Sequence, residues 1–222
     1  MLSCISFDKI CIRVCIFKME KFRGLMSMGK IYYMMGKSAS GKDTLYKEIR
    51  ESCPELKTVT LYTTRPIRDG ETDGVEYHFI SKDTLDTYEK QGKVIESRTY
   101  HTIHGDWHYA TLDDGQVELD RNSYIILGTL ESFQKMKSYY GEENIIPVYI
   151  EVEDGERLKR ALMRELSQEK PKYAEMCRRF LADSEDFSEE NIQKAGITRR
   201  FINADKIQCL EEILGEIRYG KL

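Results

Sequence analysis

The sequence predicts an α/β protein in which a parallel β-sheet is flanked by helices and interrupted by a small α+β insert. Strand-like and helix-like runs alternate along the chain, which favours a parallel sheet covered on both faces. Several strand-like runs are apolar at successive positions, as expected for parallel strands that are buried on both sides. Between residues 64 and 111 the pattern changes to short alternating pieces around one helix, and this change predicts the insert.

The elements can be assigned in chain order from these patterns. Strands are expected at 30–35, 57–61, 123–128, 145–152 and 199–202. Helices are expected at 42–52, 82–91, 129–139, 154–167, 171–187 and 206–217. We therefore predict a core formed by 29–62 and 112–222, a substrate-binding insert at 63–111 and a helical lid at about 160–180.

Bulk composition favours a soluble protein. The chain is 41% hydrophobic and 32% charged, which suits a single hydrophobic core with one or two inserted segments. The net charge of −4 and the absence of a long basic run argue against a nucleic-acid partner. No apolar stretch approaches membrane-spanning length, so no membrane association is expected. The six cysteines fit neither a metal site nor a disulfide framework, which favours a cytoplasmic location. We expect a monomer or a homodimer.

The first 28 residues lie outside the alternating pattern. Charged residues interrupt their apolar patches, and the longest uncharged apolar run, 14–17, is too short for the core of a signal peptide. We expect residues 1–28 to be a disordered extension or the product of an upstream start choice, with Met26 or Met28 as the working initiator. The alternative is a short extra strand or a partner contact.

Residues 36–44, GKSASGKDT, lie between the first predicted strand and the first predicted helix. A glycine, four residues, Gly41 and Lys42 form the pattern of a phosphate-binding loop in a strand–turn–helix setting. The glycines let backbone N–H groups converge on phosphate oxygens, and the helix directs its positive end at them. Lys42 would neutralise the outer phosphates of a nucleoside triphosphate. The loop predicts a sheet of the P-loop nucleoside-triphosphatase type.

The loop departs from the general pattern at one position. Asp43 stands where a serine or threonine normally binds magnesium, and Thr44 follows it. We expect Thr44 to take the magnesium-side role, directly or through water.

Residues 63–79, TTRPIRDGETDGVEYHF, form the most informative segment of the chain. Arg65 and Arg68 are three residues apart, and the proline between them stiffens the backbone. Such a loop can present guanidinium groups to a phosphate, because arginine matches the planar geometry of an oxyanion. The alternative is a solvated charged loop.

Together with Glu96 and residues 108–111, HYAT, these two segments resemble the guanylate kinase family of nucleoside monophosphate kinases, over roughly residues 29–218. The segment 63–79 is the specific part, because phosphate loops occur in many families. The resemblance implies phosphoryl transfer from ATP to GMP with Mg²⁺, as part of purine nucleotide metabolism. It also implies that the insert binds the monophosphate.

The resemblance also implies which residues bind the acceptor nucleotide, GMP. The phosphate of GMP is expected to meet Arg65, Arg68, Tyr77 and Tyr109, and the base is expected to meet Glu96 and Thr111. A carboxylate can accept from the ring N–H and the exocyclic amine of guanine, and a hydroxyl can donate to its carbonyl oxygen. Adenine would place a lone pair against Glu96, a mismatch that polar pockets reject. For Glu96 alone, the alternative is an exposed strand carboxylate.

On the donor side, the resemblance implies nucleotide contacts from Gly36, Ser38, Ser40, Gly41, Lys42, Asp43, Thr44 and Asn203. Family arginines at comparable places close over the donor phosphates, which implies roles for Arg164 and Arg179, followed by Arg160. For each of them, the alternative is an ordinary surface ion pair. The expected catalytic residues are Lys42, Arg65, Arg164 and Arg179.

The chain also departs from the family pattern. Leu61 replaces a usual serine, and 128–133, GTLESF, replaces an acidic motif of the form Asp-x-Asp-x-x-Gly. Three hypotheses therefore remain open: a GMP kinase, a relative acting on another phosphorylated acceptor such as dGMP, another nucleoside monophosphate or a ribose bisphosphate, and a non-catalytic binding module. The retained phosphate loop argues against the third.

Overall fold

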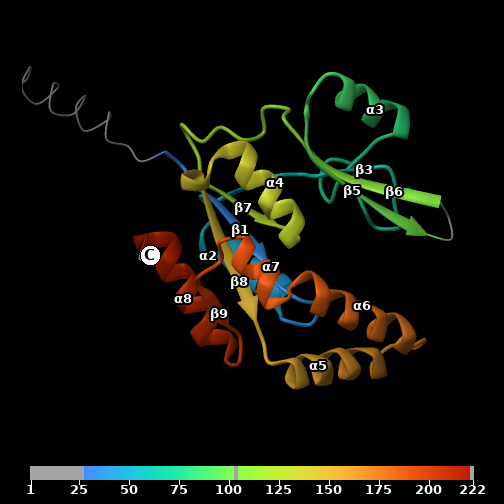
Figure 1. Ribbon diagram of the computed structural model, residues 1–222, viewed down its shortest axis with the longest axis vertical. Helices are drawn as coiled ribbons and strands as arrows, with labels where there is room; N and C mark the ends of the chain where they lie inside the picture. The colour runs from blue at the N-terminus through green and yellow to red at the C-terminus, as the bar shows by residue number, and fades with distance from the viewer. Residues whose placement is uncertain (1–27, 103–104, 221–222) are drawn as a thin grey trace, which may run out of the picture.

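The computed structural model describes residues 28–102 and 105–220, so the expectations for residues 1–27 lie outside the described residues. Its centre is a five-stranded, all-parallel sheet in the order β2–β7–β1–β8–β9 (Figure 1). The strands are β1 (Ile31–Met35), β2 (Lys57–Thr58), β7 (Tyr124–Leu127), β8 (Ile145–Glu151) and β9 (Arg200–Ile202). The prediction of a parallel sheet flanked by helices is confirmed, although β2 is shorter than the expected 57–61.

Apolar side chains on both faces of this sheet form the core. Tyr33 and Met35 of β1 face one side and Tyr32 and Met34 face the other, as the two-residue period of a strand requires. The helices α4 (Leu130–Tyr140) and α7 (Glu189–Lys194) pack on the face that carries Tyr33 and Met35. The helices α2 (Lys42–Ser52) and α8 (Lys206–Tyr219) pack on the opposite face. The helix α7 was not predicted, because its six residues bury only Ile192 and carry no readable period. A 3₁₀ turn, η1 (Glu142–Asn144), leads into β8.

A second sheet, of four strands in the order β4–β3–β6–β5, lies to one side of the first (Figure 1). Leu85 of its helix packs on Ala110 and Leu112, which gives this part a small core of its own. Its elements are β3 (Tyr62–Thr63), β4 (His78–Phe79), α3 (Lys82–Lys90), β5 (Val94–Thr102) and β6 (Gly105–Leu112).

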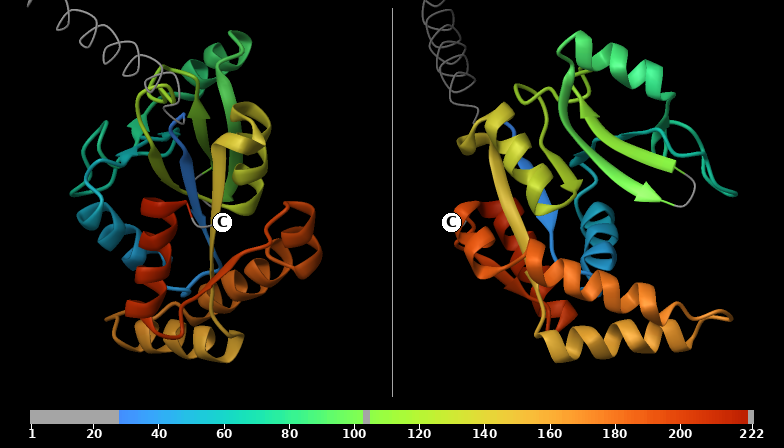
Figure 2. Two further views of the ribbon diagram at one scale, coloured as in Figure 1. Left: turned by 90° about the vertical axis from the view of Figure 1, so that its left-hand side faces the viewer. Right: turned by 45° about the vertical axis from the view of Figure 1, so that its right-hand side comes forward.

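Two helices, α5 (Asp154–Leu166) and α6 (Tyr173–Asp186), form a pair that follows β8. Figure 2 shows that this pair and the second sheet project from the parallel sheet toward the same side. None of the helices in the described ranges is long and apolar enough to cross a membrane.

Candidate functional site

The loop 36–41 connects β1 to α2 and depends on glycine at both ends. A Cβ atom on Gly36 would lie 2.5 Å from the carbonyl oxygen of Ile150 in β8. Gly41, the N-cap residue of α2, has a φ of 83°, in the left-handed region that favours glycine. Ala39, between them, also has a positive φ, of 62°, which an L-residue rarely adopts. The loop is therefore held in a conformation that local sequence preference alone would not produce.

Asn203, just after β9, braces this loop with its side chain. Its amide Nδ2 donates to the carbonyl oxygen of Ser40 at 2.7 Å, and the residue is buried. Its own carbonyl oxygen accepts from Nη2 of Arg160 at 3.1 Å. The structure thus brings Ser40, Arg160 and Asn203 together, although they are far apart in the sequence.

Lys42, Asp43 and Thr44 form the first turn of α2. Lys42 Nζ lies 3.6 Å from Asp43 Oδ2, and Asp43 and Thr44 are exposed. Within the described ranges, no three or more His, Cys, Asp or Glu side chains are grouped so as to hold a metal ion. Mg²⁺ does not need such a group, because it commonly takes one or two protein oxygens together with water and ligand phosphates. The carboxylate of Asp43 and the hydroxyl of Thr44 are hard oxygen donors that suit this ion.

The α5–α6 pair contacts the phosphate loop at Ser38. Arg179 Nη2 lies 3.3 Å from Ser38 Oγ, whereas Arg164 is exposed and farther along α5. Sequence reasoning missed Arg157, whose side chain is 1% exposed and donates Nη1 to the carbonyl oxygen of Ser38 at 3.2 Å. Arg157 Nη1 also lies 3.3 Å from Asp183 Oδ2, which accepts from the backbone N–H of Ser38 at 2.7 Å. Three residues of the helical pair therefore bind one residue of the loop.

Arg65 lies two residues after the end of β3, and its side chain is buried. Its Nη1 and Nη2 donate to the two carboxylate oxygens of Glu71 at 2.7 and 2.6 Å. Its guanidinium lies 5.1 Å from the ring centre of Tyr77 and 5.2 Å from that of Phe79. The hydrogen bonds from Arg65 lower the pKa of Glu71 to about 2, so the carboxylate is charged at neutral pH.

Tyr109 joins this group with its side chain, whereas Arg68 contacts it only through its backbone N–H, which donates to Glu71 Oε2 at 2.9 Å. The rings of Tyr77 and Tyr109 meet edge to face, with centres 5.5 Å apart. Arg68 is exposed, and its guanidinium lies 6.0 Å from the ring of Trp107. The structure therefore brings Arg65, Tyr77 and Tyr109 together and leaves Arg68 at the rim.

Glu96 and Thr111 face each other across β5 and β6. The register shifts between Val94 and Glu96, and this β-bulge turns Glu96 to the side of the sheet on which Thr111 lies. Thr111 Oγ1 donates to Glu96 Oε1 at 2.9 Å, and both residues are buried, at 3% and 2% exposure. Arg98, which sequence reasoning missed, places its Nε 3.1 Å from Glu96 Oε2. Arg98 follows Glu96 by two residues on β5, so the period of the strand places both side chains on one side of the sheet, and a strand prediction over 94–102 could have revealed it.

In the segment 128–133, Gly128 lies against the side chain of Tyr33. A Cβ atom on Gly128 would lie 2.0 Å from the hydroxyl oxygen of Tyr33. That hydroxyl is hydrogen-bonded to Ser132 Oγ at 2.6 Å. The Tyr33 side chain therefore occupies the space into which a longer residue at position 128 would extend.

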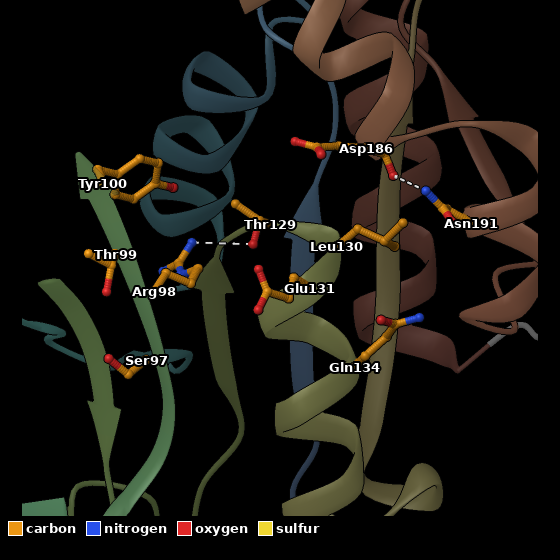
Figure 3. A pocket seen from close by; sticks show the side chains of 10 residues that line it. All are labelled: Ser97, Arg98, Thr99, Tyr100, Thr129, Leu130, Glu131, Gln134, Asp186 and Asn191. Atoms are coloured by element: carbon orange, nitrogen blue, oxygen red, sulfur yellow. Dashed lines mark hydrogen bonds between the residues drawn. The ribbon is translucent and has the colours of Figure 1, made fainter. Parts of the chain in front are cut away.

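Two hollows meet at Arg98. One, of about 410 Å³, is lined by Leu61, Tyr77, Arg98, Tyr100, Trp107, Tyr109, Leu127 and Gly128. The other, of about 550 Å³, lies between β5, the start of α4 and the α6–α7 junction (Figure 3). In Figure 3 the side chain of Arg98 reaches from β5 toward Thr129 and Glu131 of the α4 start.

Comparison with known proteins agrees with this geometry. The guanylate kinase family model matches residues 28–187. The guanylate kinase of Helicobacter hepaticus is 31% identical over 118 residues, which cover 53% of this chain and 58% of that protein. The guanylate kinase of Chlorobium luteolum is 35% identical over 85 residues, covering 38% of this chain and 41% of that protein. These matches therefore span only about half of each relative. The crystal structure of guanylate kinase from Anaplasma phagocytophilum has the same fold, with a TM-score of 0.62, 16% identity and 89% of each chain covered.

Proposed function

The chain belongs to the guanylate kinase family, and on that premise we propose that it is a nucleoside monophosphate kinase that transfers the terminal phosphoryl group of ATP to GMP. The products would be ADP and GDP. The proposal is supported by the left-handed loop 36–41 before α2, which the α5–α6 pair contacts at Ser38, and by the buried Arg65 after β3; the helical pair and the second sheet project to the same side of the molecule (Figure 2).

The donor phosphates would bind at the loop. Backbone N–H groups from Gly41 onward and the positive end of α2 attract anions, and Lys42 adds a full charge. Bound Mg²⁺ would neutralise charge on the transferred phosphate, and Thr44 and Asp43 would hold it, with phosphates and water as the remaining ligands. Arg179 already lies at the loop, and Arg164 would approach it if the helical pair closed.

The acceptor phosphate would bind near Arg65, Tyr77 and Tyr109. Glu71 and the two flanking rings fix the Arg65 guanidinium before any ligand arrives, so binding would lose little side-chain entropy. Arg68 at the rim would add long-range attraction. Phosphoryl transfer depends mainly on positioning and charge stabilisation. Two sites whose charged groups are oriented before the ligands bind would therefore suit the reaction.

An assay of ADP release in the presence of ATP and Mg²⁺, over a panel of acceptors, tests the proposal. Turnover with GMP supports it. Turnover confined to another phosphorylated acceptor would instead favour a relative with altered specificity. Leu61 and Gly128, where the chain departs from the family pattern, line the same hollow and would be the structural cause. No turnover with any acceptor, together with retained nucleotide binding, would favour the non-catalytic binding module.

A further inference from the structure

Arg98 has no role in the family resemblance, yet it contacts the carboxylate that is expected to meet the base of the acceptor. We propose that Arg98 is a positioning residue, which holds the Glu96 carboxylate in place for the base and anchors it to the start of α4. The inference rests on the proposed function and deepens it, because it states what orients Glu96 toward the 2-amino group of guanine.

The Glu96 carboxylate lies where an uncompensated charge would be costly. Its side chain is 1% exposed, and a buried charge needs a partner of opposite sign. Arg98 is two residues farther along β5, so its side chain lies on the same side of the sheet. Its own side chain is 12% exposed, and its Nε lies 3.1 Å from Glu96 Oε2. The strand therefore supplies the cation that the buried carboxylate requires.

The two oxygens of this carboxylate have different surroundings. Oε1 accepts from Thr111 Oγ1 at 2.9 Å and from Arg98 Nη2 at 3.4 Å. Oε2 is attracted by the charge of Arg98 but accepts no hydrogen bond from any of the described residues. A buried oxygen without a donor costs free energy, which an N–H group of a ligand would recover. One oxygen therefore fixes the carboxylate, and the other is left for a donor on the base.

The other end of the Arg98 guanidinium is held by the part of the protein that carries the parallel sheet. Its Nη1 donates to Thr129 Oγ1 at 3.3 Å. Thr129 is the N-cap residue of α4, and its hydroxyl also accepts from the backbone N–H of Ser132. Ser132 Oγ is hydrogen-bonded at 2.6 Å to the hydroxyl of Tyr33 in β1, the strand that precedes the loop 36–41. A chain of hydrogen bonds therefore runs from this strand through Arg98 to the acceptor carboxylate.

Both terminal nitrogens of Arg98 are engaged with the protein, so its role is to orient a neighbour. Nη2 is directed at Glu96 and Nη1 at Thr129. Because the guanidinium is planar and rigid, it cannot turn away from one partner without releasing the other. The single ammonium nitrogen of a lysine could not occupy both positions. The bridge between β5 and the start of α4 therefore requires arginine.

The unaltered full chain shows first whether the carboxylate recognises the base. We compare kcat/KM for GMP and for IMP, which lacks the 2-amino group, at saturating ATP and Mg²⁺. We expect GMP to be favoured by about tenfold or more, because IMP would leave a buried acceptor without a donor. Turnover of GMP with a ratio near one would overturn the inference and leave the proposed function intact. Absence of turnover with both would overturn both.

Arg98→Met removes the guanidinium and keeps much of its volume. Without its anchor the carboxylate is misplaced, so the ratio of kcat/KM for GMP over IMP should fall to within about threefold of one. The KM for GMP should rise by about tenfold or more, and the KM for ATP should stay within about threefold. General damage to the fold would change both KM values and leave the ratio as it was. Arg121→Ala, at an exposed arginine on the loop before β7, is the matched control and should leave the ratio unchanged. An unchanged ratio in folded Arg98→Met would overturn the inference.

A double-mutant cycle tests whether Arg98 acts through Glu96. Glu96→Gln keeps the shape of the side chain, removes its charge and should lower kcat/KM for GMP. If Arg98 serves only to position this carboxylate, adding Arg98→Met to Glu96→Gln should lower kcat/KM by less than about threefold more. A combined loss equal to the product of the two single losses would overturn the inference.

The anchor at α4 can be tested without changing Arg98, which keeps the inference falsifiable if Arg98→Met does not fold. Thr129→Val removes the hydroxyl that accepts from Arg98, whereas Thr129→Ser keeps a hydroxyl at the N-cap. The ratio of kcat/KM for GMP over IMP should fall by about threefold or more in Thr129→Val and stay at the parent value in Thr129→Ser. Equal ratios in the two variants would overturn the role of α4 as the anchor.

Discussion

Glu71 binds both terminal nitrogens of Arg65, at 2.7 and 2.6 Å, and so fixes the buried guanidinium between the rings of Tyr77 and Phe79. Nη1 also donates to the carbonyl oxygen of Pro66 at 2.9 Å, so the carboxylate and this carbonyl together take three of the five N–H donors of the guanidinium. A bidentate arginine–carboxylate pair of this kind gives orientation as well as charge. The function of Glu71 is therefore to position Arg65.

Replacing Arg65 should affect the monophosphate far more than ATP. Arg65→Ala removes the prefixed cation, and we expect kcat/KM for GMP to fall by about 10²- to 10³-fold, the usual loss when a preorganised charge-stabilising donor is removed. The KM for ATP should stay within about threefold. Arg68→Ala, at the exposed neighbour, is the control and should lower kcat/KM by much less. An equal effect of the two substitutions would contradict the placement of Arg68 at the rim.

The Arg65–Glu71 pair should make the protein sensitive to acid in a defined window. The pKa of Glu71 is lowered to about 2 from an ordinary value of 4.5 by hydrogen bonds from Arg65. A lowered pKa stabilises the fold above the ordinary value, and this contribution is lost as the pH falls from 4.5 toward 2. Urea unfolding should therefore show Glu71→Gln to be less stable than the parent at pH 6, with the difference shrinking toward pH 3. A constant difference at all pH values would show that the charge is not responsible.

Lys42 should act on turnover through its charge. Lys42→Ala removes the cation at the start of α2, and we expect kcat to fall by about 10²- to 10³-fold, because charge on the transferred phosphate would lose a preorganised partner. Lys47→Ala, one to two turns along the same helix and exposed, is the control and should retain parent activity. Activity of Lys42→Ala within a few-fold of the parent would show that Lys42 is not part of the active site.

The left-handed backbone at Ala39 predicts a stabilising substitution. An L-residue in this region costs about 1–2 kcal/mol, whereas glycine adopts it freely. Glycine also makes the unfolded chain more flexible, which costs about 0.4–1 kcal/mol. Ala39→Gly should therefore raise the free energy of unfolding by up to about 1 kcal/mol, measured by urea denaturation. Ala39→Val, which is bulkier at the same φ, should lower it, and a loss of stability in Ala39→Gly would refute the assignment of strain.

Local signals in the sequence located most of the elements. The predicted bounds 42–52 agree with α2, because a glycine and an amphipathic period mark its start and its course. The predicted helix at 82–91 likewise agrees with α3, which begins after the capping residue Ser81. In contrast, the predicted strand 57–61 pairs only over Lys57–Thr58, because its later residues lead away toward the second sheet.

Long-range contacts explain the residues that the sequence did not reveal. Arg157 and Asp183 are 26 residues apart and meet only because α5 and α6 form a pair. Arg98 meets Thr129 Oγ1 because β5 packs beside the start of α4. The hydroxyl of Tyr33 fills the space beside Gly128, a contact between β1 and the residue after β7. Each of these relationships depends on tertiary packing, which neither periodicity nor motif spacing encodes.

The contact between Arg157 and Asp183 should hold the helical pair against the phosphate loop. Arg157 is 1% exposed and Asp183 is 18% exposed, and both bind the backbone of Ser38. Removing one member of such a pair leaves the other charge without compensation, at a cost of about 3–5 kcal/mol. Arg157→Ala should therefore lower the free energy of unfolding by that amount and raise the KM for ATP, because the loop loses its brace.

A double-mutant cycle separates the ion pair from general loss of packing. If the two charges stabilise each other, the double substitution Arg157→Met with Asp183→Asn should be more stable than the sum of the single effects implies, by about 1–3 kcal/mol. Arg157→Met fills the volume beside Phe180, whose ring lies 4.1 Å from the guanidinium carbon, so the remaining deficit reports mainly the charge. Strictly additive effects would mean that Arg157 acts through Asp154, 3.1 Å from its Nε, and through packing rather than through Asp183. An unchanged KM for ATP in every variant would separate this contact from nucleotide binding.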